Sequence, residues 1–328
     1  MESRRLGRSG LRVSALGLGT MTWGRDTDDL DAADQLRDFV AAGGTLVDTS
    51  GSYGGGDAER VLGGLLAGTV PRDELVLSTK VGLVRDRGGV RTDASRRAVL
   101  DGLDASLRRL GTDHVDLLVV QAPDPGTALE ETVGALRHAV ASGRARYVGL
   151  SNHPAWAAAY AAGLLAADDT VLAAVEVEYS LVRRTAEHEV VPAALALGQG
   201  VVAWSPLGRG VLTGKYRAGV PADSRAASSH LAGFVEEYFD ARSVAVVEAV
   251  ATAAAGLGRE PLEVALAWLL ARAGVGSVLV GARTPTQLRA SLGAADLRLP
   301  AELYDALDDV SSPCADDAES WEPLAPAR

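Results

Sequence analysis

Four residues suited to proton transfer stand at or just after apolar segments in the first half of the chain. Asp48 ends the run TLVD, Lys80 ends LVLSTK, Gln121 ends DLLVVQ, and Tyr53 lies in the loop TSGSYGGG. A tyrosine, with an ordinary pKa of about 10, becomes a useful acid at neutral pH when a neighbouring cation stabilises its phenolate. Lys80 is the candidate cation, and Asp48 can hold its ammonium in a buried pair. These residue types predict general acid–base chemistry.

Each of these residues also has a structural interpretation. Asp48 could cap a turn, Lys80 could run along apolar surface to solvent, and Tyr53 could be ordinary surface packing. The later apolar runs nevertheless carry polar residues at their ends in the same way. These are Ser151 and Asn152 in YVGLSN, Glu176 and Tyr179 in VEVEY, Ser205 in VVAWS, and Arg283 after Gly281 in VGAR. Together the strand-end residues predict one shared site.

The elements that must position these residues alternate along the chain. Strands separated by helices predict a parallel sheet, because a parallel crossover usually takes a helix. Eight such units without a break in composition predict a (β/α)8 TIM barrel forming a single domain over residues 1–328, with an N-terminal β-hairpin and extra helices in the C-terminal half. The apolar runs are residues 15–19, 45–48, 75–80, 115–121, 145–151, 171–179, 200–205 and 276–281. The helical patterns are residues 28–42, 57–66, 93–110, 129–142, 154–166, 187–197, 262–273 and 286–292, with an extra helix at 241–255 after a long irregular connection, 206–240.

A doubly wound dinucleotide domain is the competing fold. Its phosphate-binding turn should read G-x-G-x-x-G after the first strand. Here the first strand ends Gly17-Leu18-Gly19-Thr20-Met21-Thr22, without the third glycine, which favours the barrel.

The bulk composition excludes several classes of protein. The chain has 328 residues, and 32 basic against 43 acidic side chains give a net charge of −11. An acidic balance argues against binding to nucleic acid or to an anionic membrane, since both need a basic patch. With a single cysteine, Cys314, and no apolar signal segment at the start, the sequence predicts a cytoplasmic protein. The histidines have no metal-ligand spacing, so no metal is expected.

At this point the sequence resembles the aldo-keto reductases over nearly its whole length. The matching segments are RRLGRSGLRVSALGLGTMTWG, VDTSGSYGGGDAERVLG, STKVG, HVDLLVVQAPDP, YVGLSN, VVAWSPLGRGVLTGKY and SVLVGARTPTQL. The resemblance implies a barrel that binds NADPH across its rim and passes hydride to a carbonyl group of a small molecule. Tyr53 would be the general acid, with Lys80 and Asp48 as its tuning partners.

The resemblance also implies cofactor contacts. Ser151 and Asn152 would bind the nicotinamide carboxamide, and Trp204 would stack on the ring. The pyrophosphate would lie along the loop made by Ser205, Pro206, Leu207, Gly208 and Gly210, with Lys215 a surface residue or peripheral phosphate contact. Arg283 and Gln287 would reach the adenosine 2′-phosphate, where a guanidinium favours NADPH over NADH. The remaining cofactor residues would be Gly19, Thr20, Met21, Asp48, Glu176, Gly281 and Ser291.

Three departures from the family pattern affect the expected chemistry. Gln121 replaces the usual histidine, and it can orient a substrate oxygen but cannot relay a proton. Glu176 stands where a glutamine commonly faces the carboxamide, and Ala290-Ser291 replaces a Glu-Asn pair that contacts adenine. Among the tryptophans, Trp23 and Trp321 are candidates for the substrate pocket beside Tyr53 and Gln121, whereas Trp156 is expected to pack in the core.

The leading hypothesis is an NADPH-dependent carbonyl reductase that acts on a small molecule. Reduction of a conjugated C=C bond is a variant that Gln121 favours. A low-turnover, NADPH-binding regulatory or redox-sensing protein is the alternative from another class. An aldolase with Lys80 as Schiff base is a further rival, which Asp48 and Tyr53 disfavour. The sequence makes no prediction about oligomeric partners.

Overall fold

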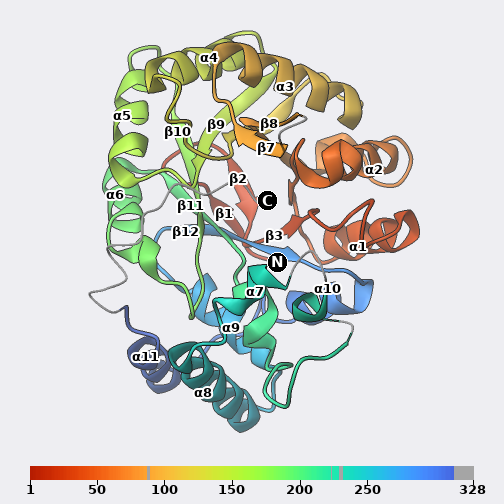
Figure 1. Cartoon of the computed structure of the whole chain (residues 1–328), viewed down its shortest axis with the longest axis vertical. Helices are drawn as coiled ribbons and strands as arrows, with labels where there is room; N and C mark the ends of the chain where they lie inside the picture. The colour runs from red at the N-terminus through yellow and green to blue at the C-terminus, as the bar shows by residue number, and fades with distance from the viewer. Residues whose placement is uncertain (87–88, 223, 229–231, 314–328) are drawn as a thin grey trace.

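Eight parallel strands close into a barrel at the centre of the molecule (Figure 1). The computed structural model describes residues 1–86, 89–222, 224–228 and 232–313. Neighbouring strands follow the order β10-β11-β12-β3-β4-β5-β8-β9, which confirms the predicted (β/α)8 architecture. Each strand falls within one residue of its predicted run: β3 (Leu16–Gly19), β4 (Leu46–Asp48), β5 (Val76–Val81), β8 (Val115–Val120), β9 (Ala145–Ser151), β10 (Leu172–Glu178), β11 (Gly200–Trp204) and β12 (Val275–Gly281).

The strands are recognisable in the sequence because both faces of each are buried, which produces continuous apolar runs. The outer faces pack against a ring of helices: α1 (Asp29–Ala41), α2 (Asp57–Leu66), α3 (Arg96–Leu110), α4 (Leu129–Ala141), α5 (Ala155–Ala166), α6 (Val190–Leu197), α9 (Pro261–Leu270) and α10 (Pro285–Leu292).

Two helices begin later than predicted, for local reasons. Before α3, the Asp93 carboxylate accepts hydrogen bonds from the backbone and hydroxyl of Ser95, which itself caps the helix by accepting from Ala98 N. Residues 93–95 therefore form a capping turn before the helix. Before α6, a short 3₁₀ turn, Thr185–Glu187, precedes the helix, which starts at Val190 so that Pro192 lies in its first turn. Proline is tolerated there because the first-turn N–H groups have no helical partner.

Several elements are absent from the sequence prediction. A hairpin of β6 (Leu83–Asp86) and β7 (Gly89–Thr92) follows β5, and α11 (Ala301–Val310) follows the barrel. The predicted extra helix is present as α8 (Ala241–Leu257), after a short α7 (Gly233–Glu236).

No single helix of the described residues is long and apolar enough to cross a membrane. Helices α8 and α9 pass the test for length and hydropathy only when taken together, and they are bent by 101° relative to each other.

Trp156 corrects one sequence expectation. It is 67% exposed rather than packed in the core. Helix α5 is apolar on all sides, so its sequence does not mark which face is buried. The buried face consists of small residues, Ala157, Ala158 and Ala161, together with Leu165. Close approach of this face to the barrel leaves the indole on the outside.

An N-terminal hairpin, β1 (Ser3–Arg5) paired with β2 (Arg12–Ser14), closes one end of the barrel. Its apolar residues, with Leu6 fully buried, form a second core cluster with residues from inside the barrel such as Leu117 and Val202. Gly7 has a φ of +60°, and a Cβ there would lie 2.3 Å from Gly198 O, so only glycine permits this approach.

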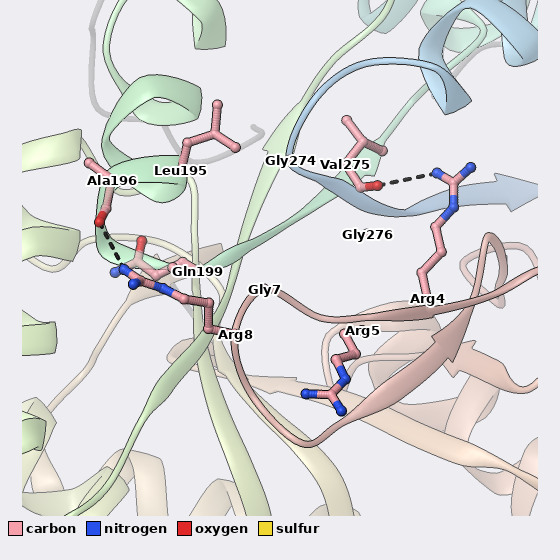
Figure 2. A pocket seen from close by; sticks show the side chains of 11 residues that line it. Arg4, Arg5, Gly7, Arg8, Leu195, Ala196, Gln199, Gly274, Val275 and Gly276 are labelled. Atoms are coloured by element: carbon pink, nitrogen blue, oxygen red, sulfur yellow. Dashed lines mark hydrogen bonds between the residues drawn. The ribbon is translucent and has the colours of Figure 1, made fainter.

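Beside the hairpin turn lies a cavity of about 550 Å³ (Figure 2). It is bordered by Arg4, Arg5 and Arg8 and by the chain leading into β11 and β12. The cavity is therefore at the end of the barrel where the strands begin. The polar strand-end residues lie at the opposite end.

Candidate active site

Asp48 and Lys80 form a buried ion pair at the ends of two adjacent strands. Asp48 is the last residue of β4, and Lys80 lies near the end of β5, which pairs with β4 in parallel. The Lys80 ammonium donates to both Asp48 carboxylate oxygens, and the two residues are 5% and 2% exposed. Because a lone buried charge is strongly destabilising, each partner depends on the other. The predicted pairing is present.

Tyr53 lies beside the Asp48–Lys80 ion pair, in a loop whose next three residues have positive φ angles. Its ring centroid is 5.6 Å from Lys80 Nζ. The following Gly54, Gly55 and Gly56 have φ values of 58°, 67° and 96°, a left-handed run that turns the chain from Tyr53 directly into α2. The three glycines are therefore required to place the phenol beside Lys80.

The pKa of Tyr53 differs from the sequence expectation in direction. Burial raises it to about 12, with Asp48 and Glu176 adding to the rise, although Lys80 acts to lower it. The phenol therefore remains protonated across the physiological range. This suits a proton donor. Desolvation, together with the carboxyl groups of Asp48 and Glu176, outweighs the effect of Lys80, on which the sequence expectation rested.

Glu176 is the third charged group of this cluster. It lies on β10, and its Oε2 is 3.4 Å from Lys80 Nζ. Neither carboxylate oxygen has a hydrogen-bond partner among the described residues, and the side chain is 1% exposed. Burial raises the pKa of Glu176 to about 7, while Lys80 opposes the rise and Asp48 adds to it. Glu176 therefore holds a proton at a higher pH than an exposed glutamate does.

Gln121 follows β8 and has a fixed orientation. Its Oε1 accepts hydrogen bonds from Ser50 Oγ at 2.8 Å and Ser52 Oγ at 3.1 Å. Ser50 Oγ also accepts from Ser52 N, and the two serine hydroxyls are 2.9 Å apart, so that either can donate to the other. The amide nitrogen of Gln121 remains as the donor available to a ligand. Sequence reasoning missed both serines, although they stand in the same loop as Tyr53.

Ser151 and Asn152 extend the site along the next strand. Asn152 has a φ of +61°, and its backbone N–H donates to Glu176 O at 2.9 Å. Its side chain donates to Ser151 Oγ and to Gln121 O, each at 3.0 Å. The strained asparagine thus ties together the ends of β8, β9 and β10, which is consistent with a functional position.

The turn at residues 205–210, directly after β11, contains four residues with left-handed backbone. Ser205, Gly208, Arg209 and Gly210 have φ values of 51°, 52°, 56° and 109°. Leu207 O accepts from Gly210 N at 2.9 Å, and Pro206 precedes it in the turn. Left-handed residues in succession are the backbone geometry found in many anion-binding loops, although here the N–H groups of Gly208 and Gly210 donate within the turn. Lys215 is exposed, with its Nζ 5.1 Å from the Tyr216 ring.

Arg209 is a functional candidate that the sequence did not indicate. Its guanidinium is 9% exposed, donates to both Glu178 oxygens at 3.0 and 2.8 Å, and bonds Phe234 O at 2.6 Å. It also pairs with Glu237. These contacts hold α7 against the end of β10. The neighbouring glycines give no signal of this role, because the carboxylate partners come from distant segments.

Predicted cofactor residues on β3 and β12 lie side by side. Gly19 pairs with Gly281, and Thr20 donates from its backbone and hydroxyl to Asp48 O, which fixes Asp48. Met21 follows, half-buried. Trp204 ends β11 with a buried indole nitrogen that has no partner among the described residues.

The residues expected near the adenosine phosphate gather around the start of α10. Gln287 Oε1 accepts from Arg283 N at 2.9 Å. Arg225 is near Arg283. Burial and the charges of Arg283 and Arg25 lower the pKa of Arg225, while Tyr216 and Asp26 act to raise it. Ser291 is 6% exposed and donates to Gln287 O within its own helix. Arg225 lies in the long connection and could not be placed from the sequence.

The structure tests one of the two tryptophans predicted to line the substrate pocket. Trp23 is fully buried in the core, and its indole nitrogen donates to Gln35 Oε1 at 3.0 Å. Trp321 lies outside the described residues. Among the described residues, no group of His, Cys, Asp and Glu is placed to hold a metal ion.

Comparisons with known proteins agree with this arrangement. Residues 15–312 match the model of the aldo/keto reductase family. The chain is 35% identical over 320 residues to an uncharacterized oxidoreductase, YrpG, of Bacillus subtilis, covering 94% of this chain and 96% of that protein. It is 32% identical over 320 residues to a Schizosaccharomyces pombe protein named "Putative voltage-gated potassium channel subunit beta", covering 94% and 92% of the two chains. The barrel, the Asp48–Lys80–Tyr53 cluster and these matches show that the chain belongs to the aldo/keto reductase family.

Proposed function

We propose that this protein transfers hydride from NADPH to the carbonyl group of a small molecule, with Tyr53 as general acid. The observation that carries the proposal is the position of the Tyr53 ring against a buried Lys80–Asp48 pair at the end of the barrel where the strands finish. In this fold, chemistry takes place at that end.

The residues present fit NADPH. Arg225 and Arg283 bring positive charge close together beside α10, which suits a phosphate dianion. The left-handed turn 205–210 suits a pyrophosphate, and the orphaned indole N–H of Trp204 marks an unsatisfied polar group near it. When bound, the cofactor supplies hydride.

The chain's own residues complete the reaction. Gln121 offers its amide N–H to the substrate oxygen, because the two serines occupy its carbonyl. Tyr53, with its pKa raised to about 12, is protonated and can donate to the oxygen as it becomes an alkoxide, a much stronger base than a phenolate. The Lys80 ammonium then faces the tyrosinate and stabilises it.

NADPH oxidation with a panel of aldehydes and ketones tests the proposal. Tyr53→Phe removes the proton donor and is expected to lower kcat by about 10²–10⁴-fold. Tyr160→Phe is the matched control, because Tyr160 is exposed on α5 and bonds only Glu130 among the residues described. Equal turnover by Tyr53→Phe and the wild type would refute the role of Tyr53. Faster reduction of an enone's C=C bond than of a saturated ketone would redirect the proposal to the double bond.

A low-turnover, NADPH-binding regulatory protein is the second candidate. The name of the S. pombe relative and the replacement of an ionisable group by Gln121 favour it. This candidate predicts tight NADPH binding with slow oxidation by every member of the carbonyl panel. Stopped-flow measurement of a single turnover distinguishes the two functions.

A further inference from the structure

Glu176 is a buried carboxyl group with no hydrogen bond to satisfy its oxygens. Its oxygens have no hydrogen-bond partner among the described residues, and its ion pair is a distant one, with Lys80 Nζ 3.4 Å from Oε2. That ammonium already contacts both oxygens of Asp48. The cluster therefore contains two carboxyl groups and one lysine, and Lys80 can fully neutralise only one of them.

The surroundings of Glu176 identify which groups set its charge. Asp48 from β4 and Lys80 from β5 are the charged groups that act on Glu176. The charge of Glu176 in turn raises the pKa of Tyr53. Its register partners in the sheet, Ser151 on β9 and Val202 on β11, carry no charge. A second positive charge brought to this end of the barrel would therefore meet an uncompensated carboxylate.

We infer that ionised Glu176 selects the oxidised, positively charged nicotinamide ring over the reduced, neutral ring, so that binding of oxidised cofactor releases the proton of this carboxyl group. The inference rests on the proposed function, which brings that ring to Tyr53. For hydride transfer, the reacting carbons must approach to about 3–3.5 Å while the substrate oxygen contacts Tyr53. The chain Tyr53–Lys80–Glu176 spans 5.6 Å, from ring centroid to ammonium, and then 3.4 Å.

The size of the discrimination follows from Coulomb's law. Opposite unit charges about 10 Å apart, in a site of effective dielectric constant about 20, change a binding constant by roughly tenfold. Asp48 and Lys80 also act on the charged ring and not on the neutral one, but this contribution is shared by the wild type and Glu176→Gln and cancels when the two proteins are compared. The phosphate groups cancel for the same reason. Glutamine at position 176 would carry no charge and would give no such discrimination.

Titration of cofactor binding against pH tests the inference. We expect the wild-type ratio Kd(NADPH)/Kd(NADP⁺), measured by quenching of tryptophan fluorescence, to rise about fivefold between pH 6 and 8.5, because Glu176 is already partly ionised at pH 6. Calorimetry at pH 7 in buffers of different ionisation enthalpy should show roughly 0.4 more protons released with NADP⁺ than with NADPH. This second readout needs no variant and no turnover.

Glu176→Gln should make the ratio of dissociation constants independent of pH, and Glu130→Gln, an exposed change of the same charge, should leave it as in the wild type. Equal proton release with both cofactors, or a wild-type ratio that does not change with pH, would overturn the inference while leaving the proposed function intact. If neither cofactor binds, the proposed function fails and the inference fails with it.

Discussion

Replacement of Glu176 by glutamine should change the pH dependence of folding stability by an amount that the structure allows to be worked out. The folded-state pKa of Glu176 is raised to about 7 by burial, against an ordinary value of 4.5. A group with a raised folded pKa contributes stability that is fully present below the unfolded pKa and is lost as pH rises through the folded one. Wild-type stability should therefore fall near neutrality for this reason.

The magnitude follows from the protons bound between pH 6 and 8. Over those two units, the native carboxyl group holds on average about half a proton, while the unfolded one holds almost none. At about 1.4 kcal/mol per proton and pH unit, the wild type should lose on the order of 1 kcal/mol relative to Glu176→Gln across this range. The difference between the two proteins cancels the other titrating groups that they share.

Urea unfolding of both proteins at half-unit steps from pH 6 to 8, followed by circular dichroism, measures this difference. Glu130→Gln serves as the surface control and should run parallel to the wild type. If the wild type and Glu176→Gln keep a constant difference over the whole range, Glu176 is ionised throughout. The description of a cluster with one cation shared by two carboxyl groups would then be wrong.

Three further predictions concern neighbouring residues. Lys80→Met leaves Asp48 and Glu176 buried without their cation and should cost about 3–5 kcal/mol in urea unfolding; a loss below about 1 kcal/mol would show that the pair is not buried in solution. Gln121→Leu removes the amide donor and should lower kcat/KM for a ketone by about tenfold without changing NADPH affinity, and a change confined to NADPH affinity would disprove substrate contact. His153, with its pKa lowered to about 4 by burial, should contribute stability that is present above pH 6.5 and lost as pH falls toward 4. Between pH 6.5 and 4, the free energy of unfolding of His153→Gln should fall by about 3 kcal/mol less than that of the wild type. An equal fall in both proteins would contradict a buried, neutral His153.

The barrel strands could be predicted closely from sequence because burial on both faces leaves uninterrupted apolar runs. The same reasoning located Asp48, Lys80 and Gln121, since each follows such a run directly. The hairpin β6–β7 was missed because LVRD and GVRT are short and half-exposed, with little apolar signal. Helix α11 lies beyond the eighth barrel unit, where the alternation of strands and helices gives no expectation.

Parts of the candidate site depend on contacts that sequence spacing does not encode. Arg209 bonds Glu178, 31 residues away, and Ser50 bonds Gln121, 71 residues away. The direction of the Tyr53 pKa shift was likewise beyond sequence reasoning, because it depends on burial and on the side chain of Glu176 from the far side of the barrel. Local motifs therefore identified the reacting groups, and tertiary contacts determined their charge and orientation.

The most direct test of the central claim is the fate of the hydride. A single turnover with NADPH carrying deuterium on the transferring face of the nicotinamide C4, and with a saturated ketone or aldehyde, should give an alcohol with deuterium on the carbinol carbon. The same experiment with Tyr53→Phe should give this product at least about a hundredfold more slowly. An alcohol without deuterium, or equal rates for both proteins, would contradict hydride transfer to a carbonyl carbon with Tyr53 as the proton donor.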